Sequence, residues 1–231
     1  MDPNTDQRSL AERLADMPLN ERTALLNKMS ATSLAALQTE WSFIARPKQL
    51  PPPGDWRIWL IMAGRGFGKT RTGAEYVRAL VESGRASRVA LVGRSAADVR
   101  DVMVEGPSGL IAIAPKDTRP TYEPSKRRVV WPNGAVAHMF SADEPSVLRG
   151  PQFDAAWADE LAAWRYDEAF DQLMFGLRLG SDPRCIVTTT PRPVKIIRDL
   201  MSASNVAVTT GSTYENRSNL APQFFEEIIK R

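Results

Sequence analysis

Apolar and polar residues alternate in blocks along the chain from residue 58 onward. Short apolar runs typical of buried strands lie at 58–62, 88–92, 153–158 and 185–189, with a weaker one at 206–209. Segments with helical spacing follow the first three runs, at 70–83, 96–103 and 161–179. Strands that alternate with helices are typical of βαβ crossovers. The pattern therefore predicts an α/β domain whose mostly parallel sheet has helices on both faces.

One pair of apolar runs departs from this alternation. Residues 128–131 and 135–141 flank Pro132-Asn133-Gly134, and Asn-Gly is the strongest short signal for a tight turn between antiparallel strands. We therefore expect an inserted β-hairpin within the α/β core.

The first 57 residues have a different character. Apolar positions within 1–45 recur at helical spacing and predict two or three short helices that pack as a layer on the larger domain. Residues 46–57 contain Pro51-Pro52-Pro53, which forbids helix and favours an extended connector that could also carry ligand contacts. A core follows at 58–219, and a further helix is expected at 223–230.

Composition places the chain among ordinary globular proteins. It has 231 residues, of which 43% are hydrophobic and 25% charged. It has no run of about 18 apolar residues that could span a membrane, and residues 1–20 lack the apolar core of a signal peptide. We expect a cytoplasmic protein. The net charge of +3 fits an anionic partner without requiring one, because Lys and Arg are scattered.

The rarest residues exclude several kinds of chemistry. With only Cys185 and His138, the chain can form neither an internal disulfide nor a zinc site built from several cysteines and histidines. His138 lies in an apolar segment that is typical of a strand, so we interpret it as a structural histidine. Chemistry must come from carboxylates, Arg, Lys, hydroxyls and backbone amides, together with a hard metal such as Mg²⁺.

A glycine-rich loop follows the first predicted strand. Ala63-Gly64-Arg65-Gly66-Phe67-Gly68-Lys69-Thr70 matches G-x-x-x-x-G-K-[ST], with Ala in place of the first Gly. Between a strand and a helix, such a loop wraps its N–H groups around the β- and γ-phosphates, while Lys69 adds a cation and Thr70 can ligate Mg²⁺. A glycine-rich turn with an exposed lysine is the alternative. The candidate nucleotide-binding residues are Gly64, Arg65, Gly66, Phe67, Gly68, Lys69, Thr70 and Arg71.

Arg65 adds a guanidinium that simple phosphate binding does not need. It could sense the γ-phosphate or stabilise charge in the transition state, or it could be a solvated loop residue.

An acidic pair ends the third strand. Asp159 would order Mg²⁺, and Glu160 would act as general base on the water that attacks the γ-phosphate. Asp-Glu pairs are also common on protein surfaces, so this pair indicates a catalytic site only in combination with the phosphate loop. Thr188, Thr189 and Thr190 end the next strand and suit a phosphate sensor, although threonine is also a common strand residue.

Together these motifs resemble the large terminase subunit of tailed bacteriophages and gene transfer agents, the ATPase that packages DNA. The resemblance spans roughly residues 41–219. It rests on A-G-R-G-F-G-K-T-R-T-G-A-E, V-L-R-G-P-Q-F-D-A-A-W-A-D-E, T-T-T-P and R-P-K-Q-L-P-P-P-G-D-W-R. It implies a RecA-like ATPase that binds ATP and Mg²⁺, with Arg65 as the arginine of the loop and Thr188 to Thr190 as the coupling motif.

The resemblance also implies roles for residues outside these motifs. Gln49, and less directly Trp41 and Arg46, map onto the family's adenine-contacting segment. Arg149 stands where related motors carry an arginine finger that enters a neighbouring subunit's site, although it could instead anchor the turn before Gly150. Arg94 is a lesser candidate for the finger. Implied catalytic residues are Glu160, Arg149, Arg65 and Lys69, and implied metal ligands are Thr70 and Asp159.

The family's partners follow from the same resemblance. They are the phosphate backbone of double-stranded DNA, a homo-oligomeric ring, the portal protein and the small terminase subunit, in the bacterial cytoplasm and transiently at the procapsid portal. Full-length large terminases carry a second, nuclease domain. We expect 220–231 to begin a linker toward it, and no nuclease activity from this chain.

Two other functions share part of the pattern. A helicase-like translocase would need a second RecA-like lobe, which 231 residues with one phosphate loop do not supply. A non-catalytic module that binds nucleotide for assembly would not need Lys69, Asp159 and Glu160.

Overall fold

The computed structural model describes residues 7–221, 223 and 224, and the chain divides into two compact units between Pro52 and Pro53. The division falls inside the proline run that the sequence marks as a connector. Just before it, Pro47–Gln49 form a single 3₁₀ turn. The helix expected at 223–230 lies almost wholly outside the described residues.

The N-terminal unit consists of short helices. They are α1 Leu10–Ala15, α2 Leu19–Leu26, α3 Ala31–Leu37 and α4 Trp41–Ile44. A capping box begins α1, since the Ser9 hydroxyl accepts from the Glu12 N–H at 3.0 Å and the Glu12 carboxylate accepts from the Ser9 N–H at 2.8 Å. None of these helices carries a fully buried residue. Helices were expected here, and the structure forms them as single turns or pairs of turns.

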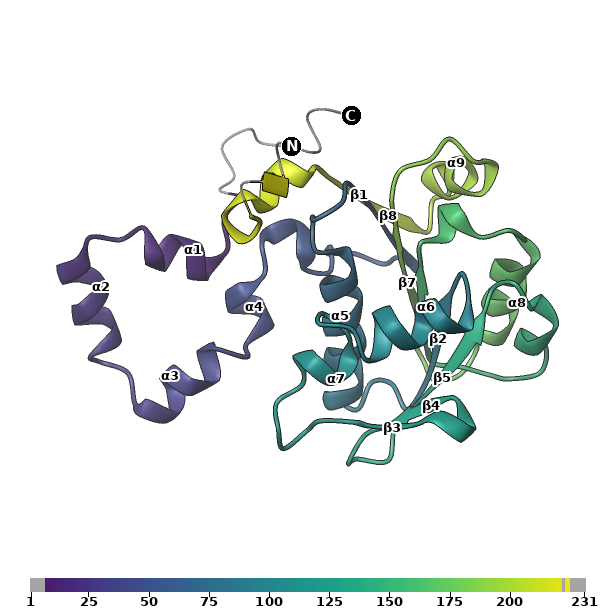
Figure 1. The fold of residues 1–231 in the computed structure, drawn as a ribbon, viewed down its shortest axis with the longest axis horizontal. Coiled ribbons are helices and arrows are strands. Elements are labelled where there is room, and N and C mark those ends of the chain that lie inside the picture. Colours follow the sequence, from purple (N-terminus) through teal and green to yellow (C-terminus); the bar gives the residue numbers. More distant parts are fainter. Residues whose placement is uncertain (1–6, 222, 225–231) are drawn as a thin grey trace. The chain divides into compact units, whose positions relative to one another are not determined.

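The larger unit is built on one sheet with the strand order β3-β4-β5-β2-β6-β7-β1-β8 (Figure 1). All neighbouring strands from β5 to β8 in this order are parallel, as predicted. The strands are β1 Ile58–Ala63, β2 Arg88–Gly93, β3 Thr121–Glu123, β4 Arg128–Val130, β5 Val136–Ser141, β6 Ala155–Asp159, β7 Arg184–Thr189 and β8 Val206–Gly211.

The expected hairpin forms, and it is part of the main sheet. β4 and β5 pair antiparallel, while the other edge of β5 pairs parallel with β2 over its whole length. The turn carries Gly134 at φ 88°, where a side chain would be strained, and the Asn133 amide donates to the Val81 carbonyl at 2.9 Å. The hairpin therefore extends the sheet through β4 and β3.

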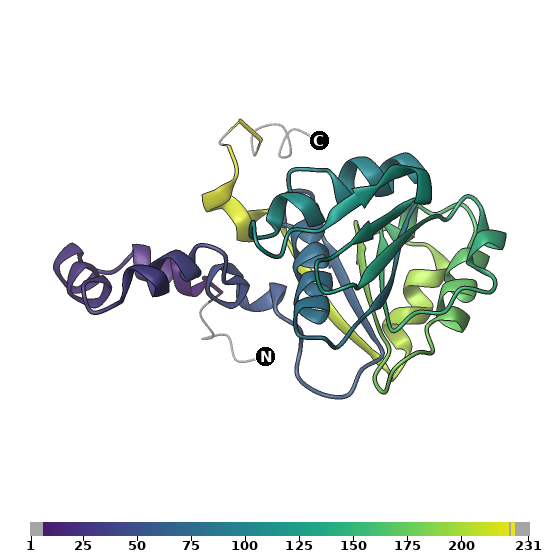
Figure 2. The same cartoon turned by 90° about the horizontal axis from the view of Figure 1, so that it is seen from below.

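Helices cover both faces of the sheet (Figures 1 and 2). α5 and α7 lie on one face, and α8 and α9 lie on the other. Their bounds are α5 Lys69–Glu82, α6 Ala96–Asp98, α7 Leu110–Ile113, α8 Glu168–Gly176 and α9 Lys195–Ser202. The helix expected at 96–103 continues beyond α6 as a π-helical turn, Val99–Val104.

The single helix expected at 161–179 is wrong. The chain forms a 3₁₀ turn at Leu161–Ala163 and then leaves helical geometry at Trp164, whose ψ is 144°. The Trp164 indole N–H donates to the Asp159 carbonyl at 2.8 Å, so this buried side chain folds back on the end of β6. Periodicity of apolar residues does not reveal such a tertiary contact.

Two apolar layers, one on each face of the sheet, form the core. On the α5 face the largest fully buried side chains are Trp59 and Trp157. Trp157 lies directly against Gly73 of α5, where a Cβ atom would stand 2.2 Å from the indole Cε2. Glycine at this position lets the helix approach the centre of the sheet.

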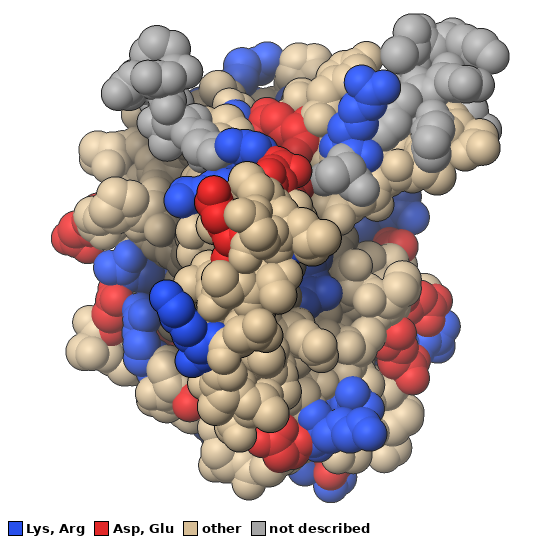
Figure 3. Space-filling view, turned by 90° about the vertical axis from the view of Figure 1, so that its left-hand side faces the viewer, with Lys and Arg blue, Asp and Glu red and all other residues tan. Residues whose placement is uncertain are grey.

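Charge is mixed over the surface. On the face shown in Figure 3, the described Lys and Arg side chains are interspersed with Asp and Glu and form no continuous basic area. Among the described residues, no helix combines the length and the apolar character needed to cross a bilayer.

Candidate functional site

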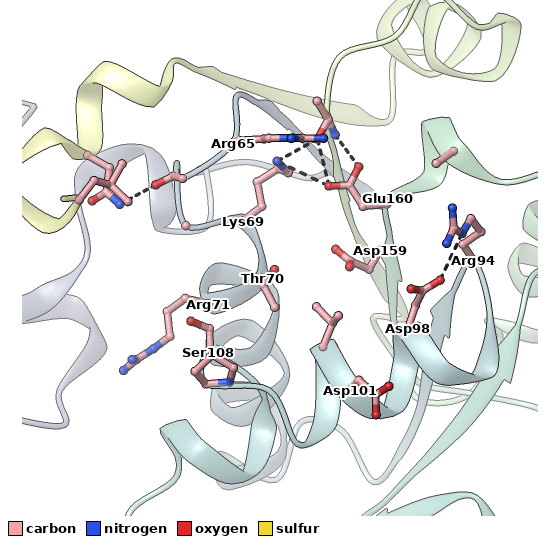
Figure 4. A pocket seen from close by; sticks show the side chains of 18 of the residues that line it. Arg65, Lys69, Thr70, Arg71, Arg94, Asp98, Asp101, Ser108, Asp159 and Glu160 are labelled. Atoms are coloured by element: carbon pink, nitrogen blue, oxygen red, sulfur yellow. Dashed lines mark hydrogen bonds and ion pairs between the residues drawn. The ribbon is translucent and has the colours of Figure 1, made fainter. Parts of the chain in front are cut away.

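The carboxyl ends of β1, β6 and β7 border a cavity of about 750 Å³ (Figure 4). Because these strands are parallel neighbours, the segments that follow them leave the sheet at one edge. The cavity is lined by the glycine-rich loop and the start of α5, by the ends of β6 and β7, by residues of the 94–108 segment and by Asn216, Asn219 and Leu220.

Lys69 sits at the centre of this edge. Its side chain is 9% exposed, and its ammonium donates to the Ala63 carbonyl at 3.0 Å and to the Thr190 hydroxyl at 3.2 Å. The Glu160 Oε1 atom is 3.6 Å away. Gly68, the N-cap of α5, has φ 98°, a conformation that favours glycine and that turns the chain from the loop into the helix. Lys69 thus joins the loop to the ends of β6 and β7.

Asp159 and Glu160 face different surroundings although they are adjacent. Burial, assisted by the neighbouring Glu160 charge, raises the pKa of Asp159 to about 6, although the hydrogen bond from the Thr188 hydroxyl and the Lys69 charge act to lower it. The Glu160 side chain is 38% exposed, and its two carboxylate oxygens accept from the Thr190 N–H and hydroxyl, both at 3.0 Å. The pair is therefore one buried and one accessible carboxylate.

The backbone of Glu160 is in the left-handed region, with φ 50° and ψ 44°. Non-glycine residues adopt this region at a cost of about 1–2 kcal/mol, and such strain concentrates at functional sites. Glu160 is the N-cap of the 3₁₀ turn, and its carboxylate accepts from the Thr190 hydroxyl. The same carboxylate faces the Lys69 ammonium (Figure 4).

The three threonines, which the sequence could not separate, have different positions. Thr188 is fully buried, donates to Asp159 Oδ1 at 2.5 Å and accepts from the Trp157 indole at 2.8 Å. Thr189 is also buried and accepts from the Ala162 N–H at 3.0 Å. Only Thr190 of the three lines the cavity. Thr190 is therefore the one of the three that lies at the cavity, and Thr188 bonds to Asp159; a phosphate contact from any of them stays a prediction.

The loop residues also divide into two groups. Arg65, Gly66, Gly68, Lys69, Thr70 and Arg71 line the cavity. Gly64 and Phe67 do not, and the Phe67 ring is buried against Gly211. The part of these two residues in nucleotide binding stays a prediction. Arg71 pairs with Glu75 at 2.7 Å.

Arg149 lies outside the cavity lining. Its guanidinium is 62% exposed and pairs with the Glu168 carboxylate at 2.6 Å. It therefore does not join Lys69 and Glu160 within the chain. Arg94 does line the cavity and pairs with Asp98 at 3.2 Å.

The expected adenine-contacting residues belong to the N-terminal unit. Gln49 and Arg46 are buried, and the Gln49 side-chain oxygen accepts from Arg46 Nε at 3.1 Å. Trp41 begins α4. Their contact with a nucleotide stays a prediction.

The residues at the cavity suit Mg²⁺, which needs few protein ligands, better than a metal ion whose ligands all come from the protein. Thr70 and Asp159 both line it, and the described residues contain no cluster of three or more His, Cys, Asp or Glu able to hold an ion. Mg²⁺ usually takes one or two protein ligands and completes its octahedron with water and substrate phosphates. A hydroxyl and a carboxylate meet that requirement.

Several cavity residues were missed from the sequence. Arg192, Asn216, Asn219 and Leu220 line the cavity, and none belongs to the loop or the acidic pair. Arg192 follows directly after the Thr-Thr-Thr-Pro motif, so its place at the end of β7 was a usable signal. The asparagines come from a 3₁₀ segment after β8. No local sequence pattern indicates that this segment lies beside the glycine-rich loop.

Replacing Thr188 by valine should loosen Asp159. The variant leaves the buried Trp157 indole N–H without an acceptor and removes a hydrogen bond to the buried Asp159 carboxylate. We therefore expect a loss of about 2 kcal/mol in the free energy of unfolding, and nucleotide binding that depends less strongly on Mg²⁺. Urea unfolding and a Mg²⁺ titration of nucleotide binding measure both. The matched control is Thr209→Val, because Thr209 accepts from the Trp59 indole at 2.9 Å and has no bond to a site carboxylate. Equal Mg²⁺ dependence in the two variants would contradict this role for Thr188.

Comparisons with solved structures identify the fold. The ATPase domain of the large terminase of Thermus phage P74-26 is similar with a TM-score of 0.61 and 14% identity, over 87% of this chain and 92% of that one. The large terminase of the thermophilic bacteriophage D6E, in complex with ADP, has a TM-score of 0.62 and 16% identity, over 87% of this chain and 49% of that one. The N-terminal domain of the DNA packaging ATPase of bacteriophage phi29 gives 0.51 and 15%, over 68% and 90%.

These likenesses confirm the expected α/β fold, which is the RecA-like fold of terminase ATPase domains. The chain spans about half of the D6E protein, at 49% of its length. No curated protein sequence matches the chain. A family model described as terminase large subunit, T4likevirus-type, N-terminal, matches residues 60–231. Since that match covers most of the chain, this protein belongs to the family formed by the N-terminal regions of T4-like large terminase subunits.

Proposed function

We propose that this chain hydrolyses ATP with Mg²⁺ and is the motor domain of a DNA-packaging terminase. The observation that carries the proposal is the meeting of Lys69, Glu160 and Thr190 at one edge of the sheet, within a cavity that the glycine-rich loop borders. In-line attack of water on a γ-phosphate needs a cation that binds the phosphate, an accessible carboxylate and a polar group that holds this carboxylate.

Each residue has a part in this reaction. Lys69 and the N–H groups at the start of α5 bind the phosphates, and Arg65 lies where it can approach the outer phosphate. Glu160 takes the proton of the attacking water, and Thr190 sets the direction of that carboxylate. When bound, Mg²⁺ would neutralise charge that develops on the phosphate oxygens, and Thr70 and Asp159 are the residues that would hold it.

Steady-state hydrolysis tests the proposal. The chain should release phosphate from ATP in the presence of Mg²⁺ and should stop when EDTA is added. The D6E large terminase forms complexes with ADP and with ATP-γ-S, so the same ligands are suitable for binding measurements. Absence of both binding and turnover at high protein concentration would overturn the proposal.

The motor function goes beyond the site. It rests on family membership and on the likeness to the phi29 packaging ATPase. We propose that hydrolysis drives double-stranded DNA into a procapsid, through contacts to phosphates, because a translocating motor must be indifferent to sequence. Partners would be further copies in a ring, the portal protein and the small subunit. Phosphate release that rises on addition of DNA of arbitrary sequence would support this coupling.

Arg149 should act on a neighbouring subunit. It projects into solvent outside the cavity of its own chain, as a finger in trans requires. Arg149→Ala chains mixed with Glu160→Ala chains should recover part of the activity that each lacks alone, because a mixed interface can combine an intact finger with an intact base. The control is Arg165→Ala, an arginine that stacks on the Tyr166 ring outside the cavity, which should need no rescue. A demonstrably mixed oligomer without recovery would exclude a finger in trans.

A further inference from the structure

The segment after β8 lies along the glycine-rich loop. β1 and β8 are parallel neighbours whose register pairs Ala63 with Gly211, so the loop and the segment leave the sheet side by side. The segment continues as a 3₁₀ helix, Thr213–Asn219. Neither the phosphate motif nor the acidic pair includes these residues.

Contacts between the two follow the loop from its beginning. The Gly64 N–H donates to the Gly211 carbonyl at 3.1 Å. A Cβ atom on Gly64 would stand 2.6 Å from the Thr213 hydroxyl oxygen, and one on Gly211 would stand 2.2 Å from the Phe67 ring. At both places, glycine permits a close approach that no other residue would allow.

The contact at the middle of the loop is polar. The Asn216 side-chain amide donates to the Gly66 carbonyl at 2.6 Å, and its oxygen accepts from the Asn219 amide at 3.0 Å. Gly66 has φ 78°, which only glycine adopts without strain, and Leu220 packs against it. Asn216 itself departs from helical geometry, at φ −111° and ψ 22°. The bond to Gly66 therefore fixes one peptide of the loop from outside the motif.

We propose that Asn216 is a positioning residue for nucleotide binding: it holds the phosphate loop in its binding conformation through Gly66. This inference rests on the proposed function. A loop with flexible glycines spends part of its time in other conformations, and the apparent dissociation constant rises in proportion as the competent fraction falls. Because coupling between two sites is reciprocal, bound nucleotide should in turn strengthen the attachment of residues 213–220.

Calorimetric titration of the chain with Mg²⁺ and ATP-γ-S tests the proposal. Asn216→Ala should raise the dissociation constant about three- to tenfold, the range that corresponds to one hydrogen bond. The matched control is Asn133→Ala, since the Asn133 amide also donates to a backbone carbonyl, that of Val81 at 2.9 Å, and lies outside the cavity lining. The control should bind as the original chain does. If the original chain binds and Asn216→Ala binds equally well, the proposal is overturned; if the original chain does not bind, the proposed function fails first.

A second pair of variants tests the contact between the loop and the 213–220 segment without changing Asn216. Gly64→Ala should weaken binding because its methyl group meets the Thr213 hydroxyl, and Thr213→Ala in the same chain should restore part of the affinity.

Hydrogen exchange gives an independent readout. Amides of residues 213–220 should exchange more slowly when ATP-γ-S is present, and this protection should be absent in Asn216→Ala. Absence of both the restored affinity and the protection would overturn the proposal.

Discussion

Glu160→Gln should bind ATP nearly as well as the original chain and should turn it over about 10²- to 10⁴-fold more slowly, the usual loss when a general base is removed. The amide oxygen can still accept from the Thr190 N–H, which now contacts Glu160 at 3.0 Å, so the shape of the site is largely kept. What is lost is the ability to take a proton. Phosphate release and ATP-γ-S titration separate the two effects.

A control variant and two contrary outcomes make this prediction specific. Glu168→Gln changes a carboxylate that pairs with Arg149, outside the cavity lining, so Mg²⁺–ATP binding should be unaffected. Hydrolysis by Glu160→Gln at the original rate would remove Glu160 from its proposed role. Loss of binding together with turnover would show that the pair with Lys69, at 3.6 Å, matters chiefly for the structure of the loop.

Gly73→Ala should have the largest effect on stability. Helix propensity alone favours alanine by about 1 kcal/mol within a helix such as α5. Here the added methyl group would stand 2.2 Å from the Trp157 ring, which is fully buried between sheet and helix. Overpacking of this kind costs about 3 kcal/mol at the upper end of its range, so the net effect is destabilising. Urea unfolding followed by circular dichroism measures it.

Ala79→Gly is the opposite substitution at an exposed position of the same helix. It should cost about 1 kcal/mol, from propensity alone. The prediction for Gly73 fails if its alanine variant is as stable as the original chain or more so. Because Trp157 bonds to Thr188 and Thr188 to Asp159, Gly73→Ala should also weaken Mg²⁺–nucleotide binding, which Ala79→Gly should leave unchanged.

Local patterns predicted the parts of the fold that depend on local physics. The apolar runs at β1, β2, β6 and β7 are buried between two layers of helices and are therefore nearly continuous in sequence. The Asn133-Gly134 turn predicted the β4–β5 pair because the conformation of a tight turn is also set by local residues. What stayed hidden was the second pairing of β5, with β2, because no local residue specifies which strand becomes a neighbour.

The site shows the same division. The loop and the acidic pair are contiguous motifs, so their chemistry could be inferred residue by residue. Separating Thr188 from Thr190 needs the register of β6 with β7, which places Asp159 beside Thr188. The Asn216 contact with Gly66 joins residues 150 positions apart. Tertiary pairing of this kind leaves no periodic signal in the sequence.

The strained backbone at Glu160 has a consequence for engineering. Asparagine and glycine adopt the left-handed region more readily than glutamate, so a selection for heat resistance alone would be drawn to this position. Both replacements remove the carboxylate. Variants enriched by such a screen would then be better folded and inactive, and any library built on this chain should keep residue 160 fixed or be counter-screened for turnover.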